Sequence, residues 1–208
     1  MRDKEETKKK ILEAVGEILA EEGFGGIGVN NVSRRAGVDK VLIYRYFGDL
    51  PGLLREFASR GDYWPSMEGL VEEAERNNRP PGAAELAVAL LKGYIRELRD
   101  STSAQELLIG ELISRNELSE ASARERERQG ADLIEALVRS APEAGRVDVA
   151  AMGALLSAGL TFLMLRARTS KAYLGIDIST KEGWERIERA LEDLVRGVMG
   201  ADRQENHQ

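Results

Sequence analysis

The sequence predicts an all-α protein, in which a small N-terminal domain of three helices precedes a larger helical domain. Apolar residues recur at helical spacing in every long segment, and in the first segment they include Ile11, Val15 and Ile18. Clusters of glycine and proline separate these segments and indicate loops. We find no strand pattern of useful length and no internal repeat.

The N-terminal domain is expected to contain three helices. The first covers about 4–22 and ends at the glycine-rich residues 23–28, because glycine tolerates the left-handed backbone of a helix stop. Two short helices follow at about 29–36 and 39–46, with a turn at Gly37 between them. Asp39 is expected to cap the second one, since its carboxylate can accept hydrogen bonds from the free N–H groups of the first turn.

The larger domain is expected to be a series of longer helices. One begins after Asp49, which can cap it, and continues to about Arg76. Residues 77–82 then break the helical pattern. Beyond the break, helices are expected at about 83–99, 104–117, 119–140, 148–169 and 180–199. Ser179 and Glu182 have the spacing of a capping box at the start of the last helix.

The composition excludes several classes of functional site. A chain of 208 residues can bury a core without disulfides or metals. It has no cysteine, and its single histidine, His207, lies in a polar tail, 201–208, that we expect to be disordered. Neither a Ser-His-Asp triad nor a cysteine or multi-histidine metal site can be built from one such chain. We therefore expect no enzyme activity, no cofactor and no metal, and a reducing, cytoplasmic location.

Charge is distributed unevenly along the chain. The overall formal charge of −6 argues against a protein that coats nucleic acid nonspecifically. Residues 1–48 hold nine basic and eight acidic side chains, whereas the remainder carries a net −7. Within residues 28–47 there are four basic side chains and one acidic side chain. A small cationic domain on an acidic body suits a protein that touches DNA at one end only.

Residues 29–47 have the pattern of a helix-turn-helix, which needs two short helices, a tight turn and apolar residues that lock the helices together. The apolar lock would be formed by Val32, Ala36, Val38, Ile43 and Phe47. With these side chains inward, the second helix presents Lys40, Tyr44 and Arg45 outward. Such a cationic and aromatic surface suits a phosphate backbone and base edges better than it suits a protein core.

Three stretches of sequence, in this order, resemble the N-terminal domain of TetR-family repressors. They are KKKILEAVGEILAEEGF, VNNVSRRAGVDKVLIYRYF and GDLPGLLREF, which together span residues 8–57, a quarter of the chain. The resemblance implies a helix-turn-helix DNA-binding domain at 1–48 and a helical ligand-binding and dimerisation domain at 49–200. It also implies a double-stranded DNA operator as the partner.

The resemblance implies a role for individual residues. The residues that would contact DNA are Thr7, Lys8, Asn30, Lys40, Val41, Leu42, Tyr44, Arg45 and Tyr46. Arg45 would bind guanine in the major groove, and Val41 and Leu42 would touch thymine methyl groups. The lysine and the two tyrosines of the second short helix would contact phosphates, and Asn30 a base or a phosphate. The two residues of the first helix would reach the flanking backbone.

The sequence departs from the family pattern at three places. Gly28 stands where Thr or Ser is usual, which removes one N-cap hydroxyl. Val41 and Leu42 stand where Gly or Thr is frequent, so the DNA-facing surface is more apolar. Leu50 stands where lysine is common, which removes one phosphate contact. We expect these differences to alter operator preference without abolishing DNA binding.

Residues 149–165 form an uncharged run that approaches the length of a membrane span. The run is rich in small residues, 32% of the chain is charged and no signal-peptide pattern opens the sequence, so we expect a helix buried in a bundle and no membrane. A helix that is apolar nearly all round must be covered on every side. Together with residues 180–199 it resembles the family's dimer face, a four-helix bundle with a second copy. A core within one chain is the alternative.

The resemblance also implies a cavity for an unknown small-molecule ligand in the middle helices. Candidate lining residues are Phe57, Trp64, Met67, Tyr94, Leu108, Glu111, Phe162 and Arg166, each of which can instead belong to an ordinary core or surface. If Glu111 is buried it must be paired or protonated, and it could then face a cationic ligand, whereas a solvated helix edge is the simpler interpretation. Arg166 could face an anionic ligand, or be a helix-end residue whose charged head stays in water.

These patterns favour a ligand-responsive repressor whose two DNA-binding domains leave register with the operator when the ligand binds. One alternative is a DNA-binding regulator controlled by a protein partner. Another is a helical enzyme that acts through Glu, Lys or Tyr, although the lack of histidine and cysteine counts against it. Activation in place of repression stays open, because the sequence carries no information on promoter position.

Overall fold

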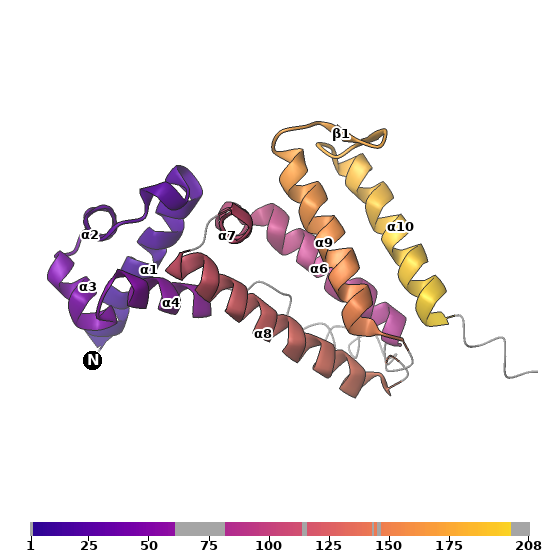
Figure 1. Cartoon of the computed structure of the whole chain (residues 1–208), viewed down its shortest axis with the longest axis horizontal. Coiled ribbons are helices and arrows are strands. Elements are labelled where there is room, and N and C mark those ends of the chain that lie inside the picture. The colour runs from indigo at the N-terminus through magenta and orange to yellow at the C-terminus, as the bar shows by residue number, and fades with distance from the viewer. Residues whose placement is uncertain (1, 61–81, 114–115, 143, 145–146, 201–208) are drawn as a thin grey trace, which may run out of the picture. The chain divides into compact units, whose positions relative to one another are not determined.

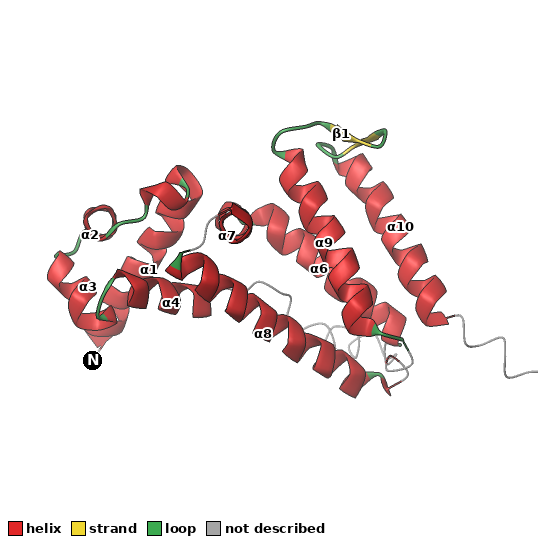
Figure 2. Ribbon diagram, viewed as in Figure 1, coloured by secondary structure: helices red, strands yellow, loops and turns green. Residues whose placement is uncertain are grey.

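The computed structural model describes residues 2–60, 82–113, 116–142, 144 and 147–200. This part of the chain is α-helical apart from one small hairpin, as predicted for the fold class (Figures 1 and 2). Trp64, Met67, the tail 201–208 and the part of the expected helix from 61 to Arg76 lie outside the described residues, whereas its first part is α4 (Leu50–Ser59).

The chain packs as two compact units. One contains Met1–Asp62 with Ser101–Glu127, and the other contains Tyr63–Asp100 with Arg128–Gln208. These units are defined by packing alone, so the expected functional division into 1–48 and 49–200 stays a prediction.

The first unit is built around the apolar side of α1. Its elements are α1 (Arg2–Glu22), the 3₁₀ turn η1 (Phe24–Gly26), α2 (Val29–Ala36), α3 (Lys40–Phe47), α4 (Leu50–Ser59), α7 (Thr102–Ile113) and the first part of α8 (Glu117–Ser140). Ile11, Val15 and Ile18 of α1 are completely buried, and α2, α4 and α7 pack against this helix. The helical spacing of these residues therefore forms the core that the sequence predicts.

Local signals set the ends of the short helices. The Asp39 carboxylate accepts a hydrogen bond from the Val41 N–H at 2.8 Å, and Asp49 accepts one from the Gly52 N–H at 2.7 Å. Both predicted caps are thus confirmed. Gly37 ends α2 with a φ of 65°, a left-handed conformation that a residue with a Cβ adopts only with strain.

The second unit is a group of long helices in which α6 packs against both α9 and α10 (Figure 1). Its elements are α6 (Ala83–Asp100), the later part of α8, α9 (Val149–Ala167), β1 (Ala172–Tyr173), β2 (Ile176–Asp177) and α10 (Lys181–Gly200). Buried Tyr94 of α6 shares a hydrogen bond of 2.6 Å with Thr161 of α9, and Lys92 of α6 pairs with Glu192 of α10. Polar contacts therefore fix the position of α6 on both of its partners. Below, helices α1 to α4 are called the head, and the elements from α6 to α10 are called the body.

Helix α9 is not covered in the way that its composition requires. The helix is long and apolar enough to cross a membrane, yet only 17% of its most apolar stretch is buried within the chain. Val149, Leu160 and Met164 are buried, whereas Leu155 is 76% and Phe162 51% exposed. Among the described residues one side of α9 is therefore left uncovered, and both interpretations of this helix, a dimer face and a core within one chain, stay predictions.

A short antiparallel hairpin joins α9 to α10 and was not expected from the sequence (Figure 2). Ala172 pairs with Asp177 and Tyr173 with Ile176, which leaves Leu174 and Gly175 as the loop. Both loop residues have positive φ, 48° and 77°, as in a type I′ turn. Asn-Gly is the usual sequence there, and a left-handed leucine costs about 1–2 kcal/mol.

The start of α10 corrects the expected capping box. Thr180, and not Ser179, accepts the hydrogen bond from the Gly183 N–H, at 3.2 Å. The Ser179 hydroxyl instead donates to the Asp177 carboxylate at 2.6 Å. Ser179 thus stabilises the hairpin and does not cap α10.

Candidate nucleic-acid interface

Helix α3 presents a cationic and aromatic side to solvent because its apolar side is fixed by α2. Ile43 is completely buried, as is Val32 of α2, and these helices pack against each other. The side chains on the other side of α3 are therefore exposed, with Val41 at 55% and Tyr44 at 50%. Lys40 and Arg45 are exposed as well, and Leu42 and Tyr46 are half-buried. The expected DNA-facing residues of α3 thus lie together on one short helix.

The N-terminal part of α1 lies beside the end of α3. The Lys4 ammonium is 5.7 Å from the centre of the Tyr46 ring, within cation–π range. Thr7, one turn further along, is half-buried. Lys4 was not among the expected contacts, and only the packing of the two helices could have revealed it.

Lys8 has partners within the protein. Its ammonium is 2.9 Å from the Glu56 carboxylate and 5.2 Å from the centre of the Phe47 ring, and its side chain is largely covered. These contacts tie α1 to α3 and α4. The phosphate contact expected of Lys8 stays a prediction, and it would compete with the ion pair.

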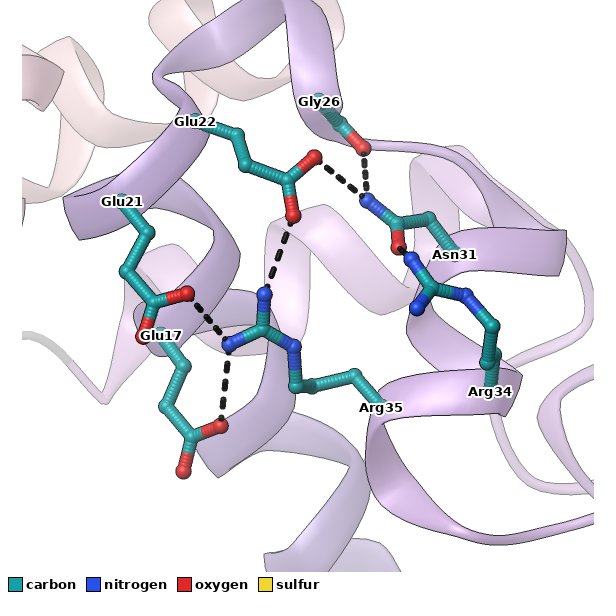
Figure 3. A network of polar contacts seen from close by, with 7 residues as sticks. All are labelled: Glu17, Glu21, Glu22, Gly26, Asn31, Arg34 and Arg35. Atoms are coloured by element: carbon teal, nitrogen blue, oxygen red, sulfur yellow. Dashed lines mark hydrogen bonds and ion pairs between the residues drawn. The ribbon is translucent and has the colours of Figure 1, made fainter.

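Arg35 is the centre of an ion-pair network that fastens α2 to α1 (Figure 3). Its guanidinium lies 2.7 Å from Glu21, 3.0 Å from Glu22 and 3.6 Å from Glu17. The hydrogen bond to Glu21, with the charge of all three carboxylates, raises the pKa of Arg35 above its ordinary value. This arginine therefore holds the head together and does not contribute a free positive charge.

Asn31 and Arg34 complete the network (Figure 3). The Asn31 amide donates to the Gly26 carbonyl at 2.8 Å and to the Glu22 carboxylate at 3.0 Å, while its own oxygen accepts from Arg34. Two of the four basic side chains of residues 28–47 are thus occupied inside the head. In the described part of the chain, Lys40 and Arg45 form no ion pair. The positive charge of this segment is concentrated on α3.

The entry to α2 shows the effect of the missing hydroxyl. Gly28 is the N-cap residue in an extended conformation and makes no side-chain cap hydrogen bond, as its sequence position implies. Asn30, in the first turn of α2, is exposed, so it lies where a DNA backbone could approach. Leu50, the first residue of α4, is half-buried and offers no charge.

Glu111, a candidate ligand residue on α7, is buried and paired. Its side chain is 7% exposed and accepts hydrogen bonds from Ser122 at 2.8 Å and from Arg126 at 2.6 and 3.2 Å. The interpretation as a solvated helix edge is therefore wrong. Arg126 lies in a run of alternating charge, 125–128, which by composition alone suits a solvated helix surface. Ser122 and Arg126 are four residues apart and so lie on one side of α8. This spacing was the only signal in the sequence, and it could be used only with the knowledge that α8 packs against α7.

The other ligand candidates are divided between the two units. Phe57 and Leu108 lie in the first unit, half-buried and buried, and Tyr94 is buried in the second. Phe162 and Arg166 are exposed on α9. All of these assignments stay predictions, although the exposed pair lies on the open side of its helix.

Comparisons with known proteins agree with this geometry. Residues 11–57 match the family model described as "Bacterial regulatory proteins, tetR family". The fatty acid degradation regulator FadR from Bacillus halodurans is 18% identical, with a TM-score of 0.62 over 95% of this chain and 96% of that chain. The TetR family transcriptional regulator PfmR from Thermus thermophilus is 21% identical, with a TM-score of 0.54 over 89% and 96%. Identities this low show a shared fold, and no curated protein sequence matches the chain.

Proposed function

We propose that the chain is a DNA-binding transcriptional regulator of the TetR family and that it acts as a homodimeric repressor released from its operator by a small molecule. A regulator of this family is not an enzyme, so the match at residues 11–57 counts against the helical enzyme as an alternative. The observation that carries the proposal is the exposed side of α3, where Lys40, Tyr44 and Arg45 lie together above a buried Ile43. A bacterial regulator of this kind acts in the cytoplasm.

The contacts of α3 with a duplex divide by chemistry. Arg45 offers a planar guanidinium that can donate two hydrogen bonds to one guanine in the major groove. Val41 and Leu42 offer methyl groups to thymine. Lys40, Tyr44 and Tyr46 lie at the rims and bind phosphates, which position the helix without specifying sequence.

A dimer is supported by the open side of α9 and by exposed apolar side chains of α10, which packs on α6 as α9 does. Besides Leu155 and Phe162, Leu194 is 58% and Val198 49% exposed. A second copy that buries these side chains forms a four-helix bundle. Two heads related by a two-fold axis then bind half-sites about 34 Å, or one helical turn, apart.

Release by a ligand would follow from a population shift between two arrangements of the body. A ligand that binds one arrangement better moves the equilibrium, and with it the spacing of the two heads. Control by a protein partner is the alternative, and it predicts that no small molecule changes operator affinity.

Selection of bound duplexes from a random pool by the purified full-length protein tests the DNA-binding proposal. We expect a near-palindromic sequence whose affinity falls with salt, because the phosphate contacts release counterions. Screening compounds for release of that operator then tests ligand control. A protein with no salt-sensitive affinity for any duplex would refute the proposal.

Arg45→Ala tests the assignment of the major-groove contact. We expect a loss of about 1–3 kcal/mol in operator binding, with relaxed preference at one position in each half-site. Tyr46→Ala should weaken all duplexes alike, since phosphates carry no sequence information. Arg139→Ala, which removes an exposed arginine from α8, is the matched control and should leave binding unchanged. An unchanged base preference in Arg45→Ala would show that this side chain does not bind a base.

A further inference from the structure

The tip of the α9–α10 hairpin carries two unfavourable features at one residue. Leu174 is 87% exposed, the largest exposure among the large apolar side chains of the described residues. Its φ of 48° is a left-handed conformation that glycine or asparagine adopts more readily. In an isolated chain a small or polar residue would be more stable at this position. We therefore ask whether the leucine has a partner in another molecule.

The hairpin is held firmly on the chain, so this exposure is not the result of a loose loop. The Ile178 N–H donates to the Lys171 carbonyl at 2.9 Å and closes the base of the hairpin. Ile178 itself is buried, and its carbonyl accepts a hydrogen bond of 2.8 Å from the indole N–H of buried Trp184. The base of the hairpin is therefore part of the core.

The second strand is also fixed against α10. The Asp177 carboxylate accepts hydrogen bonds from the Ser179 hydroxyl at 2.6 Å and the Ser179 N–H at 3.0 Å, which lower its pKa. A Cβ at Gly183 would lie 1.7 Å from the Asp177 carbonyl oxygen, so only glycine permits this approach. Strand and helix are thus in direct backbone contact, which presents the tip in one position.

The tip continues the open side of α9. The rings of Tyr173 and Phe162 meet edge to face, with centroids 5.4 Å apart and planes at 71°. Phe162 lies two turns along α9 from Leu155, so one apolar strip extends from Leu155 through this aromatic pair to Leu174. This strip is the same surface that supports the proposed dimer.

We propose that the hairpin is a dimerisation arm, in which Leu174 of each chain inserts into the apolar surface of a second copy. The proposal rests on the dimer of the proposed function and extends its interface beyond α9 and α10. A second copy fits because the apolar strip is continuous with the open side of α9. The exposed charges of α10 are of both signs, including Arg186, Arg189 and Asp193, whereas an anionic lipid surface selects a basic excess.

Leu174→Asn separates the role of the arm from the stability of the chain. Asparagine tolerates the left-handed backbone, so folding should be unaffected or improved, while the apolar contact is lost. We expect the dissociation constant of the dimer to rise about tenfold or more, the value for exposing one buried leucine side chain. Sedimentation equilibrium of the full chain measures this constant. Leu174→Gly should behave alike, and Leu112→Asn, at an exposed leucine of α7, should leave it unchanged.

A label at the tip tests insertion directly. Because the chain has no cysteine, Leu174→Cys can be labelled at this position alone with bimane. We expect its emission to shift to the blue as the protein concentration rises through the dimerisation range. The shift should be absent when Leu155→Glu is added. The thermal unfolding of Leu155→Glu should not be lowered by adding Leu174→Asn.

The outcomes distinguish the arm from the dimer. A wild-type chain that stays monomeric refutes the proposed dimer and the arm together. A dimer whose dissociation constant is unchanged in Leu174→Asn, with a label that stays in water, refutes the arm alone. A blue shift that needs added phosphatidylglycerol vesicles or another protein also refutes it, because the occupant is then not a second copy.

Discussion

Helices α1 and α9 both carry apolar side chains that need cover, but in the described part of the chain only those of α1 are covered completely. The apolar residues of α1 form a stripe, and α2, α4 and α7 bury it completely at Ile11, Val15 and Ile18. Helix α9 is apolar nearly all round, and within the chain Leu155 and Phe162 stay exposed. A stripe can be buried by neighbours on one side, whereas an all-round apolar helix needs partners on every side. Within the described residues the core around α1 is therefore complete, and the core around α9 is not.

The strongest way to break this comparison is to charge the open side of the body. Leu155→Glu with Leu194→Glu places carboxylates where a second copy should pack, and an uncompensated buried charge costs about 3–5 kcal/mol. We expect monomers in sedimentation experiments and a loss of operator affinity of at least about a hundredfold. Helix content should be retained, because both side chains are exposed in the single chain.

Leu112→Glu is the control for this double variant, since it charges an equally exposed leucine in the other unit. It should leave the oligomeric state unchanged. A double variant that still forms dimers at low protein concentration would show that the interface lies elsewhere.

A substitution in the core of the head should lower the free energy of unfolding at every protein concentration, because this core lies within one chain. Ile43→Ala removes a completely buried side chain between α2 and α3, which costs about 2–5 kcal/mol. Urea unfolding of the Leu155→Glu background measures this free energy in a single chain. Val41→Ala, on the exposed side of the same helix, should cost far less. Equal losses for the two variants would mean that α3 is oriented differently.

The second unit has polar contacts of its own, and Lys92→Met tests their weight. Lys92 lowers the pKa of Glu192 below its ordinary value of 4.5 through a hydrogen bond and an ion pair. This stabilisation is present above pH 4.5 and is lost as the pH falls through the lowered pKa. Both side chains are partly exposed, so we expect a loss of only about 0.5–1 kcal/mol at neutral pH and a smaller one in acid.

Urea unfolding of wild type and variant across this pH range provides the measurement. Lys181→Met, which removes an exposed helix-surface pair with Glu185, is the control and should have less effect. A difference between wild type and Lys92→Met that is the same in acid and at neutral pH would contradict the assigned pair.

The smallest effect should come from completing the cap of α2. Gly28→Ser supplies the missing hydroxyl in an extended conformation, and a Cβ there meets nothing within 4 Å. We expect a gain of about 0.5–1 kcal/mol from the cap and from a less flexible unfolded chain. Gly37→Ser, at a φ of 65°, should instead destabilise. A loss in thermal unfolding for Gly28→Ser would show that a side chain is not tolerated at this position.

The head was predicted well because its signals are local. Gly37, Asp39 and Asp49 act on backbone groups within a few residues, so the ends of α2 and the caps of α3 and α4 could be placed from the sequence. The split of the head's basic residues could not be foreseen, because Arg35 finds its carboxylates on another helix.

The body was predicted less completely because its decisive contacts join distant segments. Glu111 is buried only because Arg126 and Ser122 of α8 face it. The turn of the hairpin is Leu174-Gly175 and not the usual Asn-Gly, and a leucine does not indicate a turn. The sequence predicted which helices would form, and packing determined which of their side chains stay in water.

The occupied cations of the head have a consequence for how the protein searches a genome. Arg34 and Arg35 are held within the head, and Lys9 and Lys10 pair along α1. Each phosphate contact that a free cation would make adds about 0.9 to the slope of log affinity against log salt. A head with few spare cations therefore displaces few ions from arbitrary duplexes, and its residence there is short. If Arg45 binds a base as proposed, the protein spends its time mainly at duplexes that carry that base.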